Sequence, residues 1–113
     1  MPGFELIGKK EQTAVNDVFE KSGGVLFAHG FDARRNNIFR VRDFETKFAQ
    51  KLQGRRAAAC TSGTAAQYIA MKSLGITAGD EVITQSFTFI ATIEAIMACG
   101  AKPIIVDINE TYN

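Results

Sequence analysis

Residues 60–70, with the sequence CTSGTAAQYIA, contain the groups best suited to binding an anion. Gly63 lets the backbone approach a ligand closely, and the N–H groups of Gly63, Thr64 and Ala65 can converge on a phosphate at the start of a helix. The alternative is simple capping, in which the hydroxyl of Ser62 or Thr64 accepts a hydrogen bond from the first helical turn. Spacing alone favours capping, because serine and threonine cap many helices that bind no ligand.

A second candidate group is aromatic and lies in the stretch QSFTFIATIEA. Phe87 and Phe89 stand where a predicted strand gives way to a helix, and a flat ligand could stack on either ring there. Phe89 also shares a helical face with Ile93 and Ile96, which is the pattern of a core residue. The residues alone leave both alternatives open.

The remaining reactive side chains give weaker indications. Glu94 and Asp107 could orient a ligand hydroxyl or amine, but a solvated or capping role is the more common one for such residues. His29 is the only histidine, so a metal site is not expected. Cys60 and Cys99 lie in apolar surroundings without metal-ligand spacing, which predicts small, reduced core residues.

The elements that must position these residues alternate between apolar runs and segments of helical period. Their predicted order is strand 56–60, helix 64–74, strand 81–85, helix 88–99 and strand 102–107. Gly75 and Gly100 follow the two helices as C-caps. A β-α-β-α-β order implies parallel strands, and the loops at 61–64 and 85–88 then leave the same carboxyl edge of the sheet, where ligands bind.

Two further helices are predicted ahead of this region. Val15, Val18 and Phe19 indicate a short amphipathic helix that ends at Gly23 and Gly24. An irregular arm follows, and a second helix over residues 41–52 carries its apolar residues on one face and is closed by Gly54. Those apolar residues are Val41, Phe44, Phe48 and Leu52.

The composition is that of a globular protein: 46% of the 113 residues are hydrophobic, 22% are charged and the formal net charge is +1. There is neither a membrane-length apolar run nor a signal-peptide core, so we expect a cytoplasmic protein without a membrane segment. Residues 34–56 hold eight Lys and Arg against two acids. This segment lacks aromatic residues spaced to stack on bases, so a solvated or interface face is favoured over nucleic-acid binding.

Taken together, the motifs resemble those of the DegT/DnrJ/EryC1/StrS aminotransferases, pyridoxal-phosphate enzymes that act mostly on nucleotide-linked keto sugars. The resemblance covers about residues 40–113 through FE..FA, SGTAA, GDEVI, SFTF.AT, GAKP and VDI.E.YN, in that order. The arm over 22–40 matches less well. The resemblance divides the chain into an N-terminal helix and arm, 1–40, and the first part of a truncated large domain, 41–113.

The resemblance implies an α/β fold, an incomplete large domain of the type I pyridoxal-phosphate transferases. In that family the backbone at Gly63 and Thr64 binds the phosphate of pyridoxal 5'-phosphate, and Phe89 stacks on the pyridine ring. The resemblance also implies two substrates, an amino-acid donor, expected to be glutamate, and a keto-sugar acceptor. It further implies a homodimer with the active site at the subunit interface. In that fold, strands from later segments lie between the first strand, 56–60, and the second, so the first strand would lack neighbours here.

The catalytic lysine that forms the Schiff base, and the carboxylate that protonates the pyridine, belong in this family to later segments. The family's sequence motifs that carry this lysine and this carboxylate do not occur in these 113 residues. No catalytic role is assigned to any of the seven lysines. We therefore expect the chain to be inactive alone. The alternative is a non-catalytic module that binds a phosphorylated ligand or serves in assembly.

Overall fold

The computed structural model describes residues 3–111, and its contacts divide the chain into two compact units. The N-terminal unit is Met1–Ala59 and the C-terminal unit is Cys60–Asn113. The expected division into residues 1–40 and 41–113 rests on the family resemblance and not on contacts between residues, so it stays a prediction.

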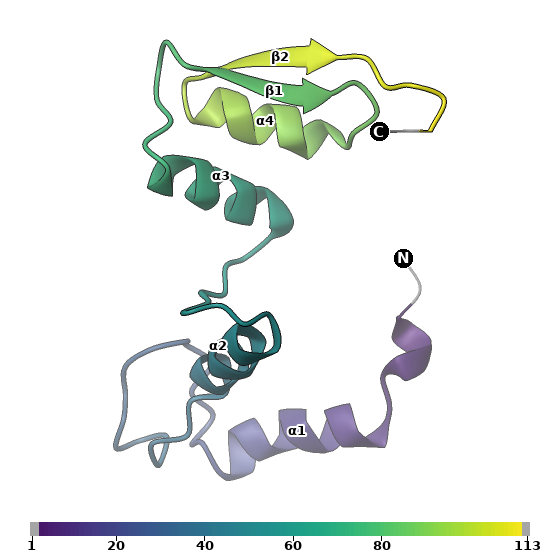
Figure 1. Ribbon diagram of the computed structural model, residues 1–113. Coiled ribbons are helices and arrows are strands. Elements are labelled where there is room, and N and C mark those ends of the chain that lie inside the picture. Colours follow the sequence, from purple (N-terminus) through teal and green to yellow (C-terminus); the bar gives the residue numbers. More distant parts are fainter. Residues whose placement is uncertain (1–2, 112–113) are drawn as a thin grey trace. The chain divides into compact units, whose positions relative to one another are not determined.

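The C-terminal unit alternates helices and strands: α3 (Gly63–Ser73), β1 (Glu81–Gln85), α4 (Ile90–Ala98) and β2 (Lys102–Val106). The two strands pair in parallel, with Glu81 opposite Lys102 and Gln85 opposite Val106 (Figure 1). A parallel pair requires a crossover, which α4 supplies. The α/β class and the four predicted elements from residue 63 onward are confirmed, because each lies within two residues of its expected bounds.

Local chemistry explains where these helices end. Gly75 and Gly100 have φ values of 85° and 84°, a region that favours glycine. Their N–H groups donate to the carbonyls of Lys72 and Met97 at 3.1 and 2.9 Å. Both glycines therefore stop their helices as predicted and turn the chain toward the next strand.

The core of the C-terminal unit lies around α4. Ile96 is only 2% exposed, and the residues buried with it or packed against it are Cys99, Ala101, Met71, Ile76 and Val82. Helix α4 contacts both strands and α3, whereas α3 contacts neither strand (Figure 1). The sheet therefore rests on α4, and α3 is held through α4.

The strand predicted over residues 56–60 is not formed, so the β-α-β-α-β order is wrong at its first member. The sheet of the described residues has two strands, and neither pairs with this segment. The N–H of Ala59 instead donates to the Glu45 carboxylate at 2.8 Å. An extended segment becomes a strand only when a neighbour satisfies its N–H and C=O groups, and no such neighbour is present among residues 3–111.

The N-terminal unit contains a short 3-10 helix, η1 (Phe4–Leu6), and the two predicted helices, α1 (Lys9–Glu20) and α2 (Arg40–Lys51). The left-handed residue after α2 is Gln53, with φ 54°, and not the expected Gly54. Gly54 still contributes to the helix end, because its N–H donates to the carbonyl of Ala49 at 2.8 Å.

The apolar face predicted for the second helix is uncovered. Phe44 is 55% exposed and Phe48 is 44% exposed, while the buried residue of α2 is Ala49. The two phenylalanine rings contact each other, with centroids 5.5 Å apart. The predicted face is therefore present, but no element of the unit packs against these two rings.

Candidate functional site

The start of α3 is fixed by Ser62. This residue has extended backbone angles, φ −163° and ψ 165°, and its Oγ accepts a hydrogen bond from the N–H of Ala65 at 3.1 Å. The Ser62 carbonyl also accepts from the N–H of Ala66 at 3.0 Å. Capping by Ser62 therefore occurs, and the expectation that Ala65 donates to a phosphate is wrong because the cap uses that N–H.

Two backbone donors remain at this helix start. Within residues 3–111, the N–H groups of Gly63 and Thr64 have no hydrogen-bond partner. A Cβ built on Gly63 would meet nothing within 4 Å, so the space beside this residue is open. The N-terminal end of a helix carries partial positive charge, and two free donors beside open space are suited to an anion.

A hollow of about 430 Å³ lies between α3 and α4, next to these donors. Its lining residues are Ser62, Thr64, Ala65, Tyr68, Glu94, Ala95 and Ala98. The exposed Glu94 carboxylate brings negative charge, and the lining contains no basic side chain. The hollow therefore suits a hydroxyl or an amine better than an anion.

The sequence did not identify Tyr68 as a lining residue, and it offered Glu94 as a possible ligand contact without placing it beside the start of α3. The helical period places Tyr68 one turn after Thr64, so that signal was present. The proximity of Glu94 could not be found in this way, because it depends on the packing of α4 against α3.

Phe89 is the N-cap residue of α4 and is 79% exposed. The alternative in which Phe89 joins Ile96 in the core is therefore wrong for this structure. Phe87 is also exposed, at 71%. Both rings follow the carboxyl end of β1, and the Phe89 ring is accessible to a flat ligand.

Hydrogen bonds fix the loop after β1 and the end of β2. The N–H of Ser86 donates to the carbonyl of Val106 at 2.8 Å. Asp107 is exposed and accepts from the N–H of Ile108 at 2.9 Å and from the Ser86 hydroxyl at 3.4 Å. Asp107 therefore ties the two strand ends together, in agreement with the capping alternative.

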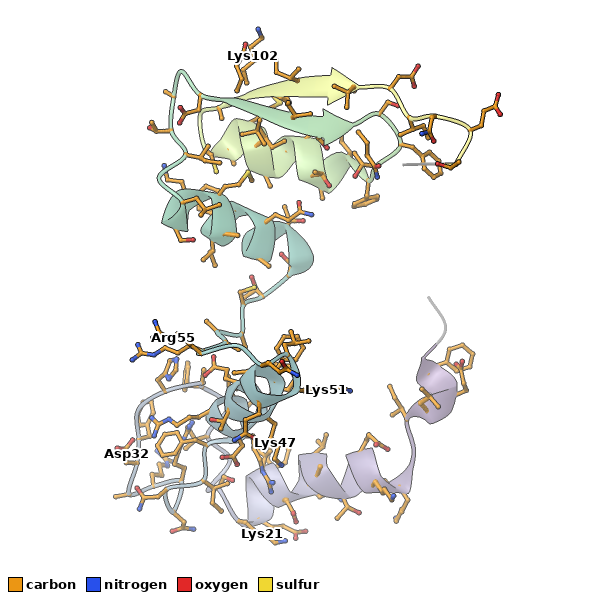
Figure 2. The ribbon with its side chains drawn as sticks, viewed as in Figure 1. Lys21, Asp32, Lys47, Lys51, Arg55 and Lys102 are labelled. Atoms are coloured by element: carbon orange, nitrogen blue, oxygen red, sulfur yellow. The ribbon has the colours of Figure 1, made fainter. Side chains whose placement is uncertain are left out.

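The C-terminal unit contains two lysines, and neither lies at the start of α3. Lys72 is on the last turn of α3, where its Nζ donates to the carbonyl of Ile76 at 3.2 Å. Lys102 begins β2, forms an ion pair with Glu81 at 3.0 Å and points away from α4 (Figure 2). No lysine of this unit is thus positioned for chemistry at the free N–H groups.

The remaining reactive residues are distributed as follows. Cys99 is buried, as predicted, whereas Cys60 is exposed because the strand expected to contain it is not formed. His29 is exposed. Among residues 3–111, no cluster of three or more His, Cys, Asp or Glu side chains could hold a metal ion.

The basic segment over residues 34–56 contains two kinds of side chain. Lys47, Lys51 and Arg55 are exposed and extend outward, as a solvated face requires (Figure 2). Arg35 is only 3% exposed, so the prediction of a solvated face is wrong for this residue. Its guanidinium donates to backbone carbonyls of the arm, including that of Phe27.

The sequence matches the DegT/DnrJ/EryC1/StrS aminotransferase family over residues 34–113. The last two positions of the VDI.E.YN motif, 112 and 113, lie outside the described residues. None of the helices within residues 3–111 has both the length and the apolar character needed to span a bilayer.

Three similar proteins illustrate the match. The UDP-2-acetamido-2-deoxy-3-oxo-D-glucuronate aminotransferase of Pseudomonas aeruginosa is 42% identical over 65% of this chain and 21% of its own length. The spore coat polysaccharide biosynthesis protein SpsC of Bacillus subtilis is 44% identical over 93% of this chain and 24% of its own. The crystal structure of NtdA from Bacillus subtilis with bound cofactor PMP has a TM-score of 0.69 and 35% identity, over 96% of this chain and 23% of that one.

Two facts follow from these similarities. The match to SpsC extends through the arm, whereas the family match begins at residue 34, within the arm. The chain spans between 21% and 24% of the length of the three proteins.

Proposed function

Because the chain belongs to the DegT/DnrJ/EryC1/StrS aminotransferase family, we propose that the protein containing it is a pyridoxal-phosphate-dependent aminotransferase. Its substrates are an amino-acid donor, glutamate in our proposal, and a nucleotide-linked keto sugar. The name of the Pseudomonas aeruginosa relative supports a UDP-linked 3-oxo sugar as one member of this substrate class. The PMP bound in the NtdA structure supports pyridoxal phosphate as the proposed cofactor.

We assign the binding of the cofactor phosphate to the free N–H groups of Gly63 and Thr64. The observation that carries this assignment is the combination of two unpartnered donors and open space beside Gly63 at the start of an eleven-residue helix. Ser62 has a supporting role, because its bond to Ala65 fixes the first turn and so the direction of both donors.

We assign the exposed ring of Phe89 to the face of the pyridine ring. Its 79% exposure supports this role, since a ring that packed in the core could not contact a ligand. An aromatic face beside a flat heterocycle contributes dispersion and fixes the ring plane. Phe89 would therefore orient the cofactor, while Gly63 and Thr64 hold it.

Pyridoxal phosphate, when bound, supplies an electron sink that allows the amino group to leave the donor and later join the acceptor. The residues of this chain bind and orient; none of them is assigned a proton transfer. In our proposal the lysine and the carboxylate that complete the site come from outside these 113 residues, so the chain alone is inactive.

The proposed architecture is a type I large domain to which residues 41–113 contribute the first part and residues 1–40 a preceding helix and arm. We further propose a homodimer with the site at the subunit interface, and a cytoplasmic location. These statements rest on family membership, since the described residues include neither a partner subunit nor the rest of the domain.

Replacing Gly63 tests the phosphate assignment in the protein expressed from the complete gene. Proline at the first position of a helix is favourable, and Ser62 already has the extended backbone that proline requires of its predecessor. Gly63→Pro therefore removes the N–H donor at residue 63 without disrupting the helix. Gly63→Ala is the matched control, because it retains that N–H. Because a hydrogen bond to a charged group contributes about 1.5–3 kcal/mol, we expect Gly63→Pro to raise the Kd for pyridoxal phosphate at least tenfold.

The measurement is the absorption band of bound pyridoxal phosphate, titrated in all three proteins, with circular dichroism to verify folding. Folded wild-type protein without such a band would contradict the proposed function. Saturable binding of inorganic phosphate in that same protein would then favour the non-catalytic alternative. Equal affinities in the proline and alanine variants would contradict the role of the Gly63 N–H.

A further inference from the structure

The arm between α1 and α2 exposes a pair of aromatic rings, those of Phe27 and Phe31. Phe27 is 69% exposed and Phe31 is 56% exposed, and the ring centroids lie 5.7 Å apart in a stacked arrangement. Leu26, next to them in the chain, is 74% exposed. Aromatic rings stabilise a structure most when they are covered, so this exposed pair is a surface on which another flat group can pack.

The backbone of Phe31 is strained. Its φ is 58°, in the left-handed region that bulky residues rarely adopt and that glycine adopts without cost. The Phe31 carbonyl accepts from the N–H of Arg35 at 3.1 Å, which helps to hold this turn. Within residues 3–111 the ring partner of Phe31 is Phe27, and neither ring is buried. The unit therefore keeps a strained phenylalanine without burying its ring, and strain of this kind is typical of binding sites.

Phe27 and Phe31 both line a hollow of about 320 Å³ within the N-terminal unit. This volume lies at the lower end of the range of small-molecule sites, roughly 300–1,000 Å³. Val25 and Leu26 belong to the same lining, and so does one charged residue, Arg34. The lining lies between residues 23 and 34, where the one acid, Asp32, is not part of it. The hollow therefore combines an aromatic surface, apolar side chains and a single cation.

Arg34 is the cation of the arm that remains available to a ligand. It is exposed, and none of the ion pairs among residues 3–111 includes it. The neighbouring Arg35 is buried and donates to the carbonyls of Ala28, at 3.4 Å, and Phe27, so it holds the backbone that carries one of the rings. A guanidinium binds phosphate oxygens through paired N–H donors. An exposed guanidinium in the same lining as two exposed rings indicates a ligand with a flat ring and an anionic group.

We propose that this hollow binds a nucleotide, whose base stacks on the Phe27–Phe31 pair and whose phosphate pairs with Arg34. Every base has a π-face, and stacking on aromatic side chains is a common way in which proteins bind it. A fatty acid lacks the flat ring, and a nucleoside would leave Arg34 without an anion. All residues of the site belong to the N-terminal unit, so this proposal does not rest on the proposed cofactor site.

Titration calorimetry with UMP and with AMP tests this site in the protein expressed from the complete gene. The protein is saturated with pyridoxal phosphate, so that the nucleotide phosphate cannot occupy the N–H groups of Gly63 and Thr64. Phe27→Leu keeps an apolar side chain but removes one ring, and it should weaken nucleotide binding about tenfold. Phe44→Leu is the matched control, because Phe44 is 55% exposed and its ring pairs with Phe48 outside the hollow.

The phosphate end of the ligand is tested separately. Arg34→Gln should weaken UMP binding about tenfold or more, because the charged partner of the phosphate is lost, and should leave the affinity for uridine unchanged. Arg55→Gln changes another exposed arginine of the unit and should have no effect (Figure 2). Ribose phosphate, which lacks a base, should bind equally to the wild type and to Phe27→Leu.

Thermal unfolding of Phe31→Gly separates binding from folding. Without nucleotide this variant should unfold at the same temperature as the wild type or higher, because glycine adopts the left-handed backbone without strain. UMP should raise the Tm of the wild type and of Phe44→Leu, and have a much smaller effect on Phe31→Gly.

Three results would overturn the proposal. Absence of saturable binding of both nucleotides, with self-association that Phe27→Leu weakens in sedimentation, would assign the rings to a second copy of the protein. Equal nucleotide affinities in Phe27→Leu and Phe44→Leu would place the base elsewhere. Benzoate that bound as tightly as the nucleotides would assign the hollow to aromatic carboxylates. None of these outcomes depends on whether the protein transfers amino groups.

Discussion

Gly23 shows how one backbone position determines the path of the arm. It has φ +60°, and a Cβ built on it would lie 2.5 Å from the backbone carbonyl oxygen of Arg34. A real Cβ cannot approach a backbone oxygen so closely, and backbone moves at greater cost than a flexible side chain. Glycine is therefore required here both for its dihedral angles and for the close contact.

Gly23→Ala should destabilise the arm by more than the roughly 1 kcal/mol expected from positive φ alone. The neighbouring Gly24 is a matched control, since its φ is +68° but its nearest contact is an ordinary 3.7 Å to Phe19. Amide hydrogen exchange over residues 21–39 measures the difference. Similar losses of protection in the two variants would contradict a role for the Arg34 contact.

The Ser62 hydroxyl determines how many backbone N–H groups at the start of α3 are without a hydrogen-bond acceptor, because it accepts from the N–H of Ala65. Ser62→Ala should cost about 1 kcal/mol of helix stability and expose the N–H of Ala65, which loses its acceptor. Faster hydrogen exchange at the Ala65 amide is the expected result. Ser73→Ala, at the other end of the same helix, should leave this amide unchanged, and unchanged exchange in Ser62→Ala would contradict the assigned cap.

Among the elements, α1 depends on pH through its first turn. The N–H of Gly8 donates to the Glu11 carboxylate at 2.8 Å, and this bond, with a smaller contribution from the N–H of Glu11 itself, lowers the pKa of Glu11 below its usual 4.5. The glycine N-cap has no side-chain acceptor, so Glu11 provides the side-chain contact at this helix end.

Because the folded pKa of Glu11 is below the unfolded value, its contribution is fully present above about pH 4.5. It is lost as the pH falls through the lowered pKa. We expect the helicity of α1 to decrease over that range, and Glu11→Gln to remove much of the decrease. Nuclear magnetic resonance titration of the helix amides measures both, with Glu20→Gln at the opposite helix end as the control. A titration of α1 that is the same in both variants would contradict this mechanism.

The packing of α4 holds the C-terminal unit together. Ile96 is 2% exposed and lies in the core with Cys99 and Ala101. Ile96→Ala should lower the free energy of unfolding by about 2–5 kcal/mol, because it removes buried methyl groups and leaves a cavity.

Met97→Ala is the control on the same helix, since Met97 is 61% exposed and its removal should change stability by about 0.5 kcal/mol or less. Urea unfolding followed by circular dichroism compares the two variants. A small effect of Ile96→Ala would mean that α4 is not the centre of the core.

On the scale of the whole molecule, large apolar side chains remain uncovered in both units. Phe44 and Leu52 of the N-terminal unit are 55% and 63% exposed, and Ile83 and Phe89 of the C-terminal unit are 72% and 79% exposed. Exposed apolar residues in such number are typical of surfaces that contact other segments or chains. They support the proposal that residues 41–113 are one part of a larger domain.

The sequence by itself was sufficient for the family and for most features set by neighbouring residues, although it placed the left-handed residue after α2 at Gly54 and not at Gln53. The bounds of β1, the glycines after α3 and α4, and the serine cap could be predicted because each depends on residues within about four positions. The SGTAA and GDEVI motifs indicated the family on the same local basis.

Only the tertiary structure decided the features that require a distant partner. Residues 56–60 have the composition of a strand, but an extended segment needs a neighbour to complete its hydrogen bonds. Arg35 is buried although its segment was expected to be solvated. Phe89 is exposed, where its spacing had left a core position and a ligand-facing position both open, because burial depends on what packs against a side chain. Sequence periodicity reports which face of an element a residue occupies, whereas contacts between elements determine whether that face is covered.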